Sequence, residues 1–260
     1  MADTPETRRI EVRREHDGQV LRVVLATPPG NILDAATMAE IVAGLEHHRA
    51  ERGIKALVFE GQGKHFCFGA SVEEHQKAQA PAMIAAFHGL FKKLLDFGAP
   101  LVALVRGQCL GGGMELASFC NFVLAEPKAK FGQPEIQLGV LPPVAAVILP
   151  GIVGQLRADD LVLTGRSIDA ETARDWGLVC QVAEDGEAAL QEFLAAHILP
   201  KSAESLRQAN RAVRATWYAE LGQRLDRMER LYVDELMATA DANEGIESFL
   251  AKRKPSWQNR

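Results

Sequence analysis

The sequence lacks the features that mark several common classes of protein. Its four cysteines, Cys67, Cys109, Cys120 and Cys180, show no Cys-x-x-Cys spacing. That absence argues against a zinc knuckle or a redox pair and fits a reducing cytoplasm. The seven histidines form no metal-ligand spacing either. We therefore expect no metal site.

Long apolar runs and an excess of basic residues are also absent. No apolar stretch approaches the roughly 20 residues that a membrane-spanning helix needs. The polar segment 1–14 lacks the apolar core of a signal peptide. A net charge of −5 gives no general electrostatic case for binding nucleic acid or an anionic membrane. We expect a cytoplasmic protein that binds neither.

The first two thirds of the chain show strand-like and helix-like runs in alternation. The turn signal Asp17-Gly18 predicts a hairpin, and Asp34 can cap a helix that begins near Ala35. Such alternation indicates an α/β domain with mostly parallel strands, whose ligand crevice lies at the carboxyl ends of those strands. The predicted strands are 10–12, 20–25, 56–59, 101–105 and 122–125.

Beyond Ser167 the chain changes character, and the segment 202–236 is rich in Arg, Glu, Leu and Ala and shows no strand signals. We expect a core at 1–200 and a C-terminal helical region at 201–260 that serves as a lid, an oligomer arm or both. The predicted helices of this half are 169–176, 187–198, 202–236 and 241–254.

Three consecutive glycines, Gly111 to Gly113, follow the predicted strand 101–105 and precede a helical run. A strand, a glycine turn and a helix together direct free backbone N–H groups at an anion. Glu115 lies in the first helical turn and Glu135 in a later loop. Two carboxylates beside such donors suit proton transfer next to a stabilised oxyanion. The alternative is a tight turn with Glu115 as a helix-dipole partner.

Three motifs give the chain a resemblance to a known family. They are Phe66-Cys67-Phe68-Gly69-Ala70, Gly111-Gly112-Gly113-Met114-Glu115-Leu116-Ala117, and Phe131-Gly132-Gln133-Pro134-Glu135-Ile136 with Gly139. With these motifs in this order, essentially the whole chain resembles the crotonase family of enoyl-CoA hydratases and isomerases. The resemblance implies a spiral of βαβ units with a C-terminal helical region, assembled as a homotrimer or a homohexamer.

The resemblance also implies a chemistry. The substrate is an acyl-CoA thioester, and since coenzyme A is part of that substrate, no separate cofactor is expected. The N–H groups of Ala70 and Gly112 form the oxyanion hole. Glu115 and Glu135 are the catalytic acids, which favours a hydratase, a hydro-lyase, over an isomerase. Substrate or CoA contacts are expected at Lys64, Phe68, Gly69, Gly111 and Pro143.

Within the family, the segments 69–72, 108–113, 165–169 and 231–260 resemble members that hydrate a cyclic diene thioester. Pro142-Pro143-Val144-Ala145-Ala146 replaces the glycine-rich loop of ordinary hydratases, so Pro143 removes an N–H and the loop gains apolar bulk. We interpret this as a pocket for a flat ring. Ser71 and Glu73 replace an aspartate and a lysine, which weakens one usual CoA contact.

Several readings stay open at this stage. A straight-chain enoyl-CoA hydratase or an isomerase is the nearest rival, and a non-catalytic acyl-CoA-binding protein is a second. A dinucleotide site is disfavoured because Gly-x-Gly-x-x-Gly is absent. The run Lys252-Arg253-Lys254 is either a solvated face or a contact to CoA phosphates. We interpret Cys67 and Cys109 as packing residues, and His75 as a surface histidine rather than a pocket residue.

Overall fold

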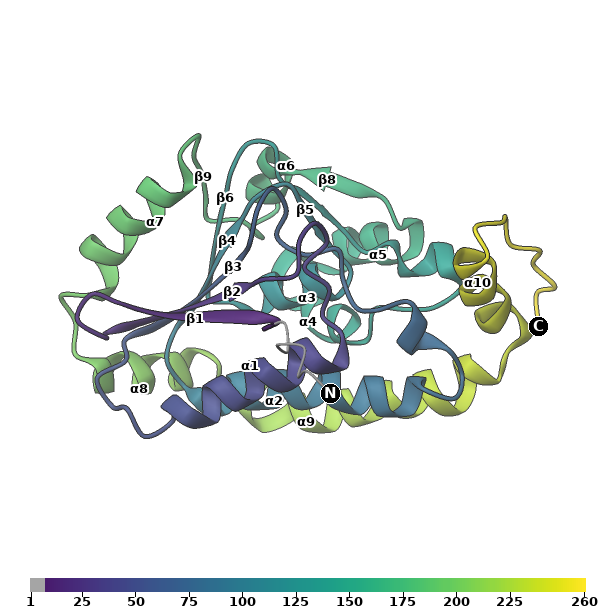
Figure 1. The fold of residues 1–260 in the computed structure, drawn as a ribbon, viewed down its shortest axis with the longest axis horizontal. Helices are drawn as coiled ribbons and strands as arrows, with labels where there is room; N and C mark the ends of the chain where they lie inside the picture. The colour runs from purple at the N-terminus through teal and green to yellow at the C-terminus, as the bar shows by residue number, and fades with distance from the viewer. Residues whose placement is uncertain (1–7) are drawn as a thin grey trace, which may run out of the picture.

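The protein, described by a computed structural model at residues 8–260, is built on two sheets (Figure 1). The larger has six strands in the order β1-β2-β3-β4-β6-β9, and the smaller has three in the order β5-β7-β8. Among the strands of residues 8–260, the β1–β2 and β7–β8 pairs are antiparallel and the other pairs are parallel. The strands are β1 Ile10–Glu15, β2 Val20–Leu25, β3 Ala56–Gly61, β4 Leu101–Val105, β5 Gln108–Leu110, β6 Phe122–Ala125, β7 Lys130–Gly132, β8 Ser167–Asp169 and β9 Gln181–Val182.

Both faces of the larger sheet are covered by helices. Leu57 and Phe59 of β3 belong to the main core with α1 and α2, whereas Val58 packs on the opposite side against Leu190 and Leu194. Every residue of β2, β3 and β4 is buried as a result. This double coverage explains the unbroken apolar runs in these strands, because a sheet with one solvated face would alternate apolar and polar residues.

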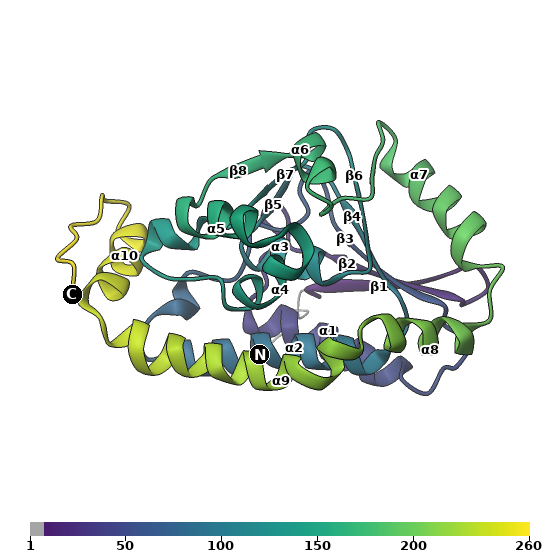
Figure 2. The ribbon, with the colours of Figure 1, turned by 180° about the vertical axis from the view of Figure 1, so that it is seen from behind.

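The helices form two groups around the sheets. In Figures 1 and 2, α1, α2 and α9 run together as a layer below the sheets, and α7 lies across the other face. The helices are α1 Ala35–His48, α2 Ala80–Phe97, α3 Gly112–Phe119, α4 Pro143–Val153, α5 Gln155–Thr164, α6 Ala170–Asp175, α7 Gly186–Phe193, α8 Ala203–Val213, α9 Ala215–Arg230 and α10 Ala240–Leu250. Short 3₁₀ turns cover Glu73–His75, Pro134–Leu138 and Leu236–Ala238, and π-helical turns cover Leu194–Ile198 and Leu231–Glu235.

Local signals at the N-terminal half act as predicted. The chain reverses between β1 and β2 at Asp17-Gly18, where both residues have positive φ and the Gly18 N–H donates to the Glu15 carbonyl at 3.0 Å. The Asp34 side chain accepts the Thr37 N–H at 2.8 Å and caps α1. The predicted α/β fold with mostly parallel strands is confirmed.

The C-terminal half differs from the prediction in its strands, in the run 202–236 and in its last helix. Strands β8 and β9 are short pieces that pair with distant strands, and neither was predicted. The run 202–236 is divided into α8, α9 and two short turns. The last helix, α10, ends at Leu250 rather than at Lys254. Lys252 has φ +53°, and Arg253 then turns back to pair with Glu244, so the chain leaves the helix earlier.

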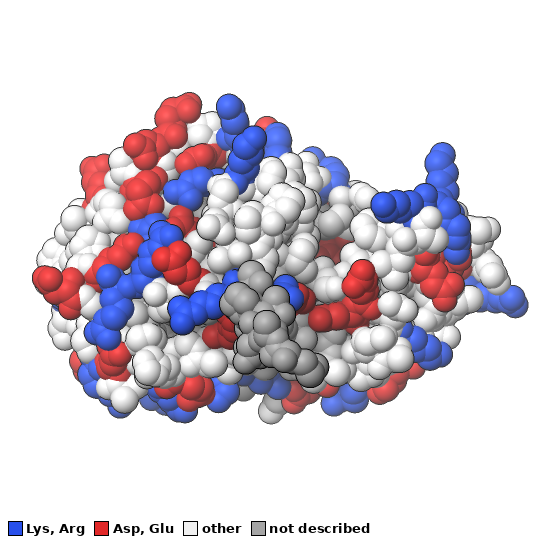
Figure 3. All heavy atoms as spheres, in the orientation of Figure 1, with Lys and Arg blue, Asp and Glu red and all other residues white. Residues whose placement is uncertain are grey.

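The C-terminal segment forms one end of the molecule. In Figures 1 and 2, α10 and the tail lie at the far end from α7 and close to the end of α9. Acidic and basic side chains are interspersed on the face in Figure 3, with no field of one sign. Within the described residues no helix is both long and apolar enough to cross a bilayer.

Candidate active site

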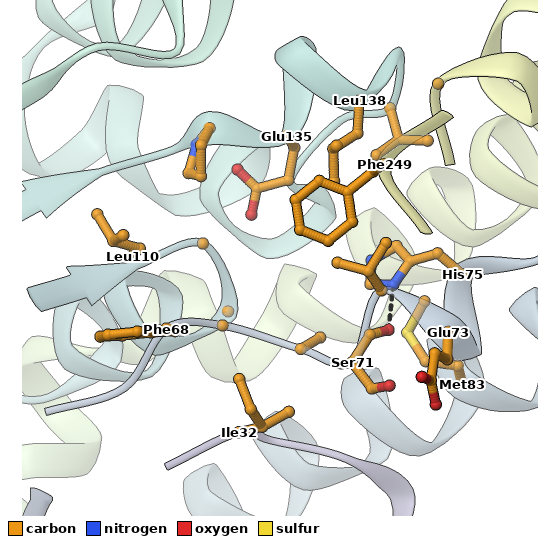
Figure 4. Close-up of a pocket in the computed structure, with 18 of the residues that line it drawn as sticks. Ile32, Phe68, Ser71, Glu73, His75, Met83, Leu110, Glu135, Leu138 and Phe249 are labelled. Atoms are coloured by element: carbon orange, nitrogen blue, oxygen red, sulfur yellow. Dashed lines mark hydrogen bonds between the residues drawn. The ribbon is translucent and has the colours of Figure 1, made fainter. Parts of the chain in front are cut away.

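One cavity of about 830 Å³ opens beside the carboxyl ends of β2, β3, β5 and β7. Loops that follow these strands contribute Thr27, Phe68 to Val72, Leu110 to Gly112, and Glu135. α2 and α10 close the cavity from the other side. The crevice therefore lies where parallel α/β sheets place their ligands, and Figure 4 shows side chains from these loops facing it.

The loop after β3 turns one backbone N–H into this cavity. Gly69 has φ +109°, and its carbonyl accepts the Leu33 N–H at 3.0 Å. Because the carbonyl and N–H of one trans peptide point in opposite directions, the Ala70 N–H points away from Leu33. Among residues 8–260 the Ala70 N–H has no acceptor.

The loop after β5 presents a second N–H in the same way. Gly111 has φ +50°, and its carbonyl accepts the Glu115 N–H at 2.9 Å. The Gly112 N–H, in the same peptide, therefore points in the opposite direction, out of the first turn of α3. It too lacks an acceptor within the described part of the chain.

The two free amides converge. A Cβ placed on Gly112 would lie 3.2 Å from the Ala70 nitrogen, and one placed on Gly69 would lie 3.4 Å from the Gly112 nitrogen. The loops therefore touch at these backbones, which only glycine permits. A pair of neighbouring donors at a helix N-terminus is a site for a negatively charged oxygen.

Glu115 lies on α3, one turn beyond the second donor. Its side chain is 2% exposed, and Oε1 accepts the Ala145 N–H at 2.7 Å in the first turn of α4. Burial raises the pKa of Glu115 to about 7, while the amide at the α4 N-terminus favours the ionised form. The carboxyl group is thus placed to exchange a proton near neutral pH.

Glu135 lies across the cavity on the 3₁₀ turn Pro134–Leu138, and Oε1 lies against Gly111. Its Oε2 is buried and has no partner among residues 8–260. Burial and the nearby charge of Glu115 both raise the pKa of Glu135 well above its usual value. The two carboxyls therefore differ in environment, because the backbone amides of α4 stabilise the ionised form of Glu115 and not that of Glu135.

Most residues predicted from the sequence line this one cavity. Ala70, Gly112, Glu115 and Glu135 do so, as do Phe68, Gly69, Gly111 and Pro143. Lys64 is exposed and does not line it. Arg253 of the predicted basic run does, although its guanidinium pairs with Glu244.

Other residues line the cavity that the sequence analysis did not assign to it. His75, interpreted as a surface histidine, lines the cavity, and so do Phe87 of α2 and Phe249 of α10. The spacing of His75 to Ser71, four residues along a tight turn, was the one local signal available. Phe249 carried none, because only the packing of α10 brings it to the cavity. Cys67 and Cys109 are buried, as expected.

Comparison with known proteins agrees with this geometry. The model of the enoyl-CoA hydratase/isomerase family matches residues 15–260, and the chain belongs to that family. Membership of this family implies that the substrate class is an acyl-CoA thioester. Among its relatives, cyclohexa-1,5-dienecarbonyl-CoA hydratase of Thauera aromatica is 46% identical over 251 residues, covering 96% of this chain and 97% of the relative.

Other relatives show the same fold and class. A probable enoyl-CoA hydratase of Rhizobium meliloti is 38% identical and covers 95% of this chain and 97% of the relative. The crystal structure of an enoyl-CoA hydratase from Mycobacterium avium subsp. paratuberculosis superposes with a TM-score of 0.84 at 25% identity, covering 97% and 99% of the two chains. These matches confirm the crotonase-like fold predicted from the motifs.

Proposed function

We propose that this enzyme adds water to cyclohexa-1,5-diene-1-carbonyl-CoA and gives 6-hydroxycyclohex-1-ene-1-carbonyl-CoA, a step in anaerobic degradation of aromatic acids through benzoyl-CoA. The observation that carries hydration is the convergence of two free amides beside two buried carboxyls whose pKa values are both raised. The cyclic diene rests on the 46% identical relative, whose name states that substrate class.

The thioester oxygen binds between the N–H groups of Ala70 and Gly112. An enolate oxygen carries full charge only near the transition state, so fixed donors stabilise it more than the neutral carbonyl. Because neither amide has another acceptor in the described chain, no hydrogen bond within the protein is broken when the oxygen binds. Each donor of this kind lowers the barrier by about 3 kcal/mol.

The two carboxyls take different roles in this proposal. Glu115, with a pKa of about 7 and an amide partner, is the base that deprotonates the attacking water. Burial and the nearby charge of Glu115 raise the pKa of Glu135 well above its usual value, which favours its protonated form, so we assign Glu135 as the acid. The base returns its proton to solvent after product release, and the acid is reprotonated.

The ring decides where the second proton goes. Water attacks the β carbon, and the enolate that forms is conjugated with the second double bond. Protonation at the far end of that conjugated system places hydrogen and hydroxyl on opposite corners of the ring. The apolar segment Pro143–Ala145, which forms the start of α4 beside Glu115, supports a flat apolar ring at this position.

Product analysis in heavy water tests the proposal. With the cyclic dienoyl-CoA, we expect one deuterium on the ring carbon opposite the hydroxylated carbon. Deuterium on the carbon next to the thioester would show ordinary 1,2-addition. Turnover of crotonyl-CoA without turnover of the ring substrate would support the straight-chain hydratase, and shifting of a double bond without water uptake would support the isomerase.

A non-catalytic acyl-CoA-binding protein is the remaining alternative. Binding a thioester requires neither a buried acid of pKa about 7 nor a second buried carboxyl of raised pKa beside it. Burying two such groups lowers the free energy of unfolding, and binding alone does not require them. Thioester binding without turnover of any unsaturated acyl-CoA would revive this alternative.

We also propose a cytoplasmic homotrimer or homohexamer. The support is the family resemblance together with large apolar side chains on helices that face outward: Leu156 is 82% exposed, Leu163 67% and Val213 81%. The region 201–260 supplies part of the cavity wall through α10. Light scattering of the purified protein measures the mass of the assembly directly.

A further inference from the structure

His75 places an unoccupied hydrogen-bond acceptor in the acyl cavity. Its Nδ1 lies 2.6 Å from the Ser71 carbonyl oxygen, which can only accept, so Nδ1 carries the hydrogen. In the neutral ring Nε2 then has a free lone pair. Burial lowers the pKa of His75, which keeps the ring neutral at neutral pH.

The lone pair faces space rather than protein. Nε2 has no partner among residues 8–260, and it is not one of the fully buried unpaired polar atoms of that part of the chain. Since the side chain lines the cavity, Nε2 is accessible from it. Figure 4 shows the imidazole at this cavity with its bond to Ser71.

The surroundings hold the ring in one orientation. The Ser71 bond fixes one edge, and the Tyr232 ring lies against it with centroids 6.3 Å apart. The side chains at this end include the apolar Met83, Ile84 and Leu138, and Glu73 lies beside Met83 (Figure 4). An acceptor in this part of the cavity wall favours a ligand that carries a hydrogen-bond donor. A ligand without a donor would leave the Nε2 acceptor unpaired.

The acceptor lies within reach of the acyl group. Ser71 directly follows the oxyanion donor Ala70, and two residues span at most about 7 Å. Tyr232, whose ring lies beside His75, has its pKa raised by burial and then by the charges of Glu135 and Glu115, so it lies near both carboxyls. The hydroxyl that hydration creates is a donor within this same region.

We propose that His75 Nε2 accepts a hydrogen bond from the hydroxyl group of the hydrated acyl thioester. His75 is then a binding residue that favours the hydroxylated product over the unsaturated substrate. The inference rests on the proposed hydratase function but not on the ring, since straight-chain hydration also creates a hydroxyl.

Two variants of His75 distinguish the role of Nδ1 from that of Nε2. His75→Asn keeps a donor near the Nδ1 position, which can still bind the Ser71 carbonyl. It places no acceptor at the position of Nε2. His75→Gln places an amide oxygen near the Nε2 position and lacks the Nδ1 donor. Both are made in the Glu135→Gln background, so that the thioesters are bound but not turned over, and circular dichroism checks that each variant folds.

Calorimetry measures the affinity for matched thioesters with and without the hydroxyl. The pairs are 6-hydroxycyclohex-1-ene-1-carbonyl-CoA with cyclohex-1-ene-1-carbonyl-CoA, and 3-hydroxybutyryl-CoA with butyryl-CoA. For at least one pair we expect His75→Asn to weaken binding of the hydroxyl member about five- to tenfold and to leave the other member unchanged. His75→Gln should restore the preference to within about twofold.

The outcomes distinguish this inference from the proposed substrate. A hydroxyl preference that depends on His75 in the butyryl pair alone would keep the role of His75 and reject the ring. Equal weakening of both members, no weakening in either pair, or loss in His75→Gln but not in His75→Asn would overturn the role. The last result would show that Nδ1 only holds the Ser71 backbone.

Discussion

A single buried carboxyl, Glu115, couples both activity and stability to pH. If Glu115 is the base, only its ionised form activates water, so kcat/KM should rise with pH through about 7. Replacing it by Gln should lower kcat by about 10²- to 10⁴-fold. Steady-state kinetics between pH 5 and 9 measure both effects. A profile that is flat across pH 7 would contradict the assignment.

The stability of the fold should change in the opposite sense. The folded pKa of Glu115 is raised from 4.5 to about 7, so its contribution to stability is complete below pH 4.5 and is lost as pH rises through 7. At about 1.4 kcal/mol per pH unit, the loss is on the order of 3 kcal/mol. Glu115→Gln should therefore unfold at higher denaturant than wild type at pH 8, with little difference at pH 4. Equal midpoints at both values would contradict the raised pKa.

The glycine before each donor amide is the second sensitive position. Gly111→Ala puts a Cβ at φ +50° and into the Glu135 carboxyl, so we expect kcat to fall by roughly 100-fold as the Gly112 donor shifts. Gly89→Ala is the matched control, because a Cβ there meets nothing within 4 Å. The control should keep full activity and gain about 0.5–1 kcal/mol of stability in α2. Activity retained in Gly111→Ala would contradict the role of this turn.

At the scale of elements, the second face of the large sheet has its own core. Leu190 of α7 is fully buried there against the strands and lies outside the cavity wall. Leu190→Ala should cost about 2–5 kcal/mol of unfolding free energy in urea titration, with kcat changed less than twofold. A large fall in kcat in the still-folded variant would show that the two faces are coupled.

Elements could be predicted where local chemistry determines them. Leu101–Val105 was predicted to the residue because an apolar run follows Pro100 and is buried on both faces. The strand Ser167–Asp169 was missed because its three residues have no pattern of their own and become a strand only by pairing with Lys130–Gly132. Short strands of this kind depend on a distant partner rather than on propensity.

The residues of the site also fall into those that the sequence predicts and those that depend on distant packing. Gly112, Glu115 and Glu135 could be predicted because motifs fix glycines and acids at set positions beside strand ends, and the fold brings those ends together. Contacts across the cavity could not be predicted from the sequence. His75 and Phe249 enter it through the packing of η1, the turn Glu73–His75, against α10. Apart from the spacing of His75 to Ser71, no pattern in the sequence records that packing.

At the scale of the whole molecule, residues near both termini meet at the cavity. Arg9 and Arg253 both line it, and the tail is held there by backbone bonds as well as by charge. The Asp241 carboxylate accepts the N–H groups of Gln258 and Asn259 at 2.6 Å, and Arg253 pairs with Glu244. We therefore expect a single tail residue, Arg253, to contribute to substrate binding without being needed for the fold.

That arrangement predicts a binding defect in Arg253→Ala. A CoA thioester carries phosphates, and a guanidinium in the cavity wall can bind one of them once it exchanges its Glu244 partner. We expect KM to rise about three- to tenfold with kcat within twofold, since the catalytic acids are untouched, and KM should depend less on salt. Arg224→Ala, which breaks an exposed pair on α9 away from the cavity, is the control and should match wild type. A kcat that falls together with an unchanged KM would place Arg253 outside substrate binding.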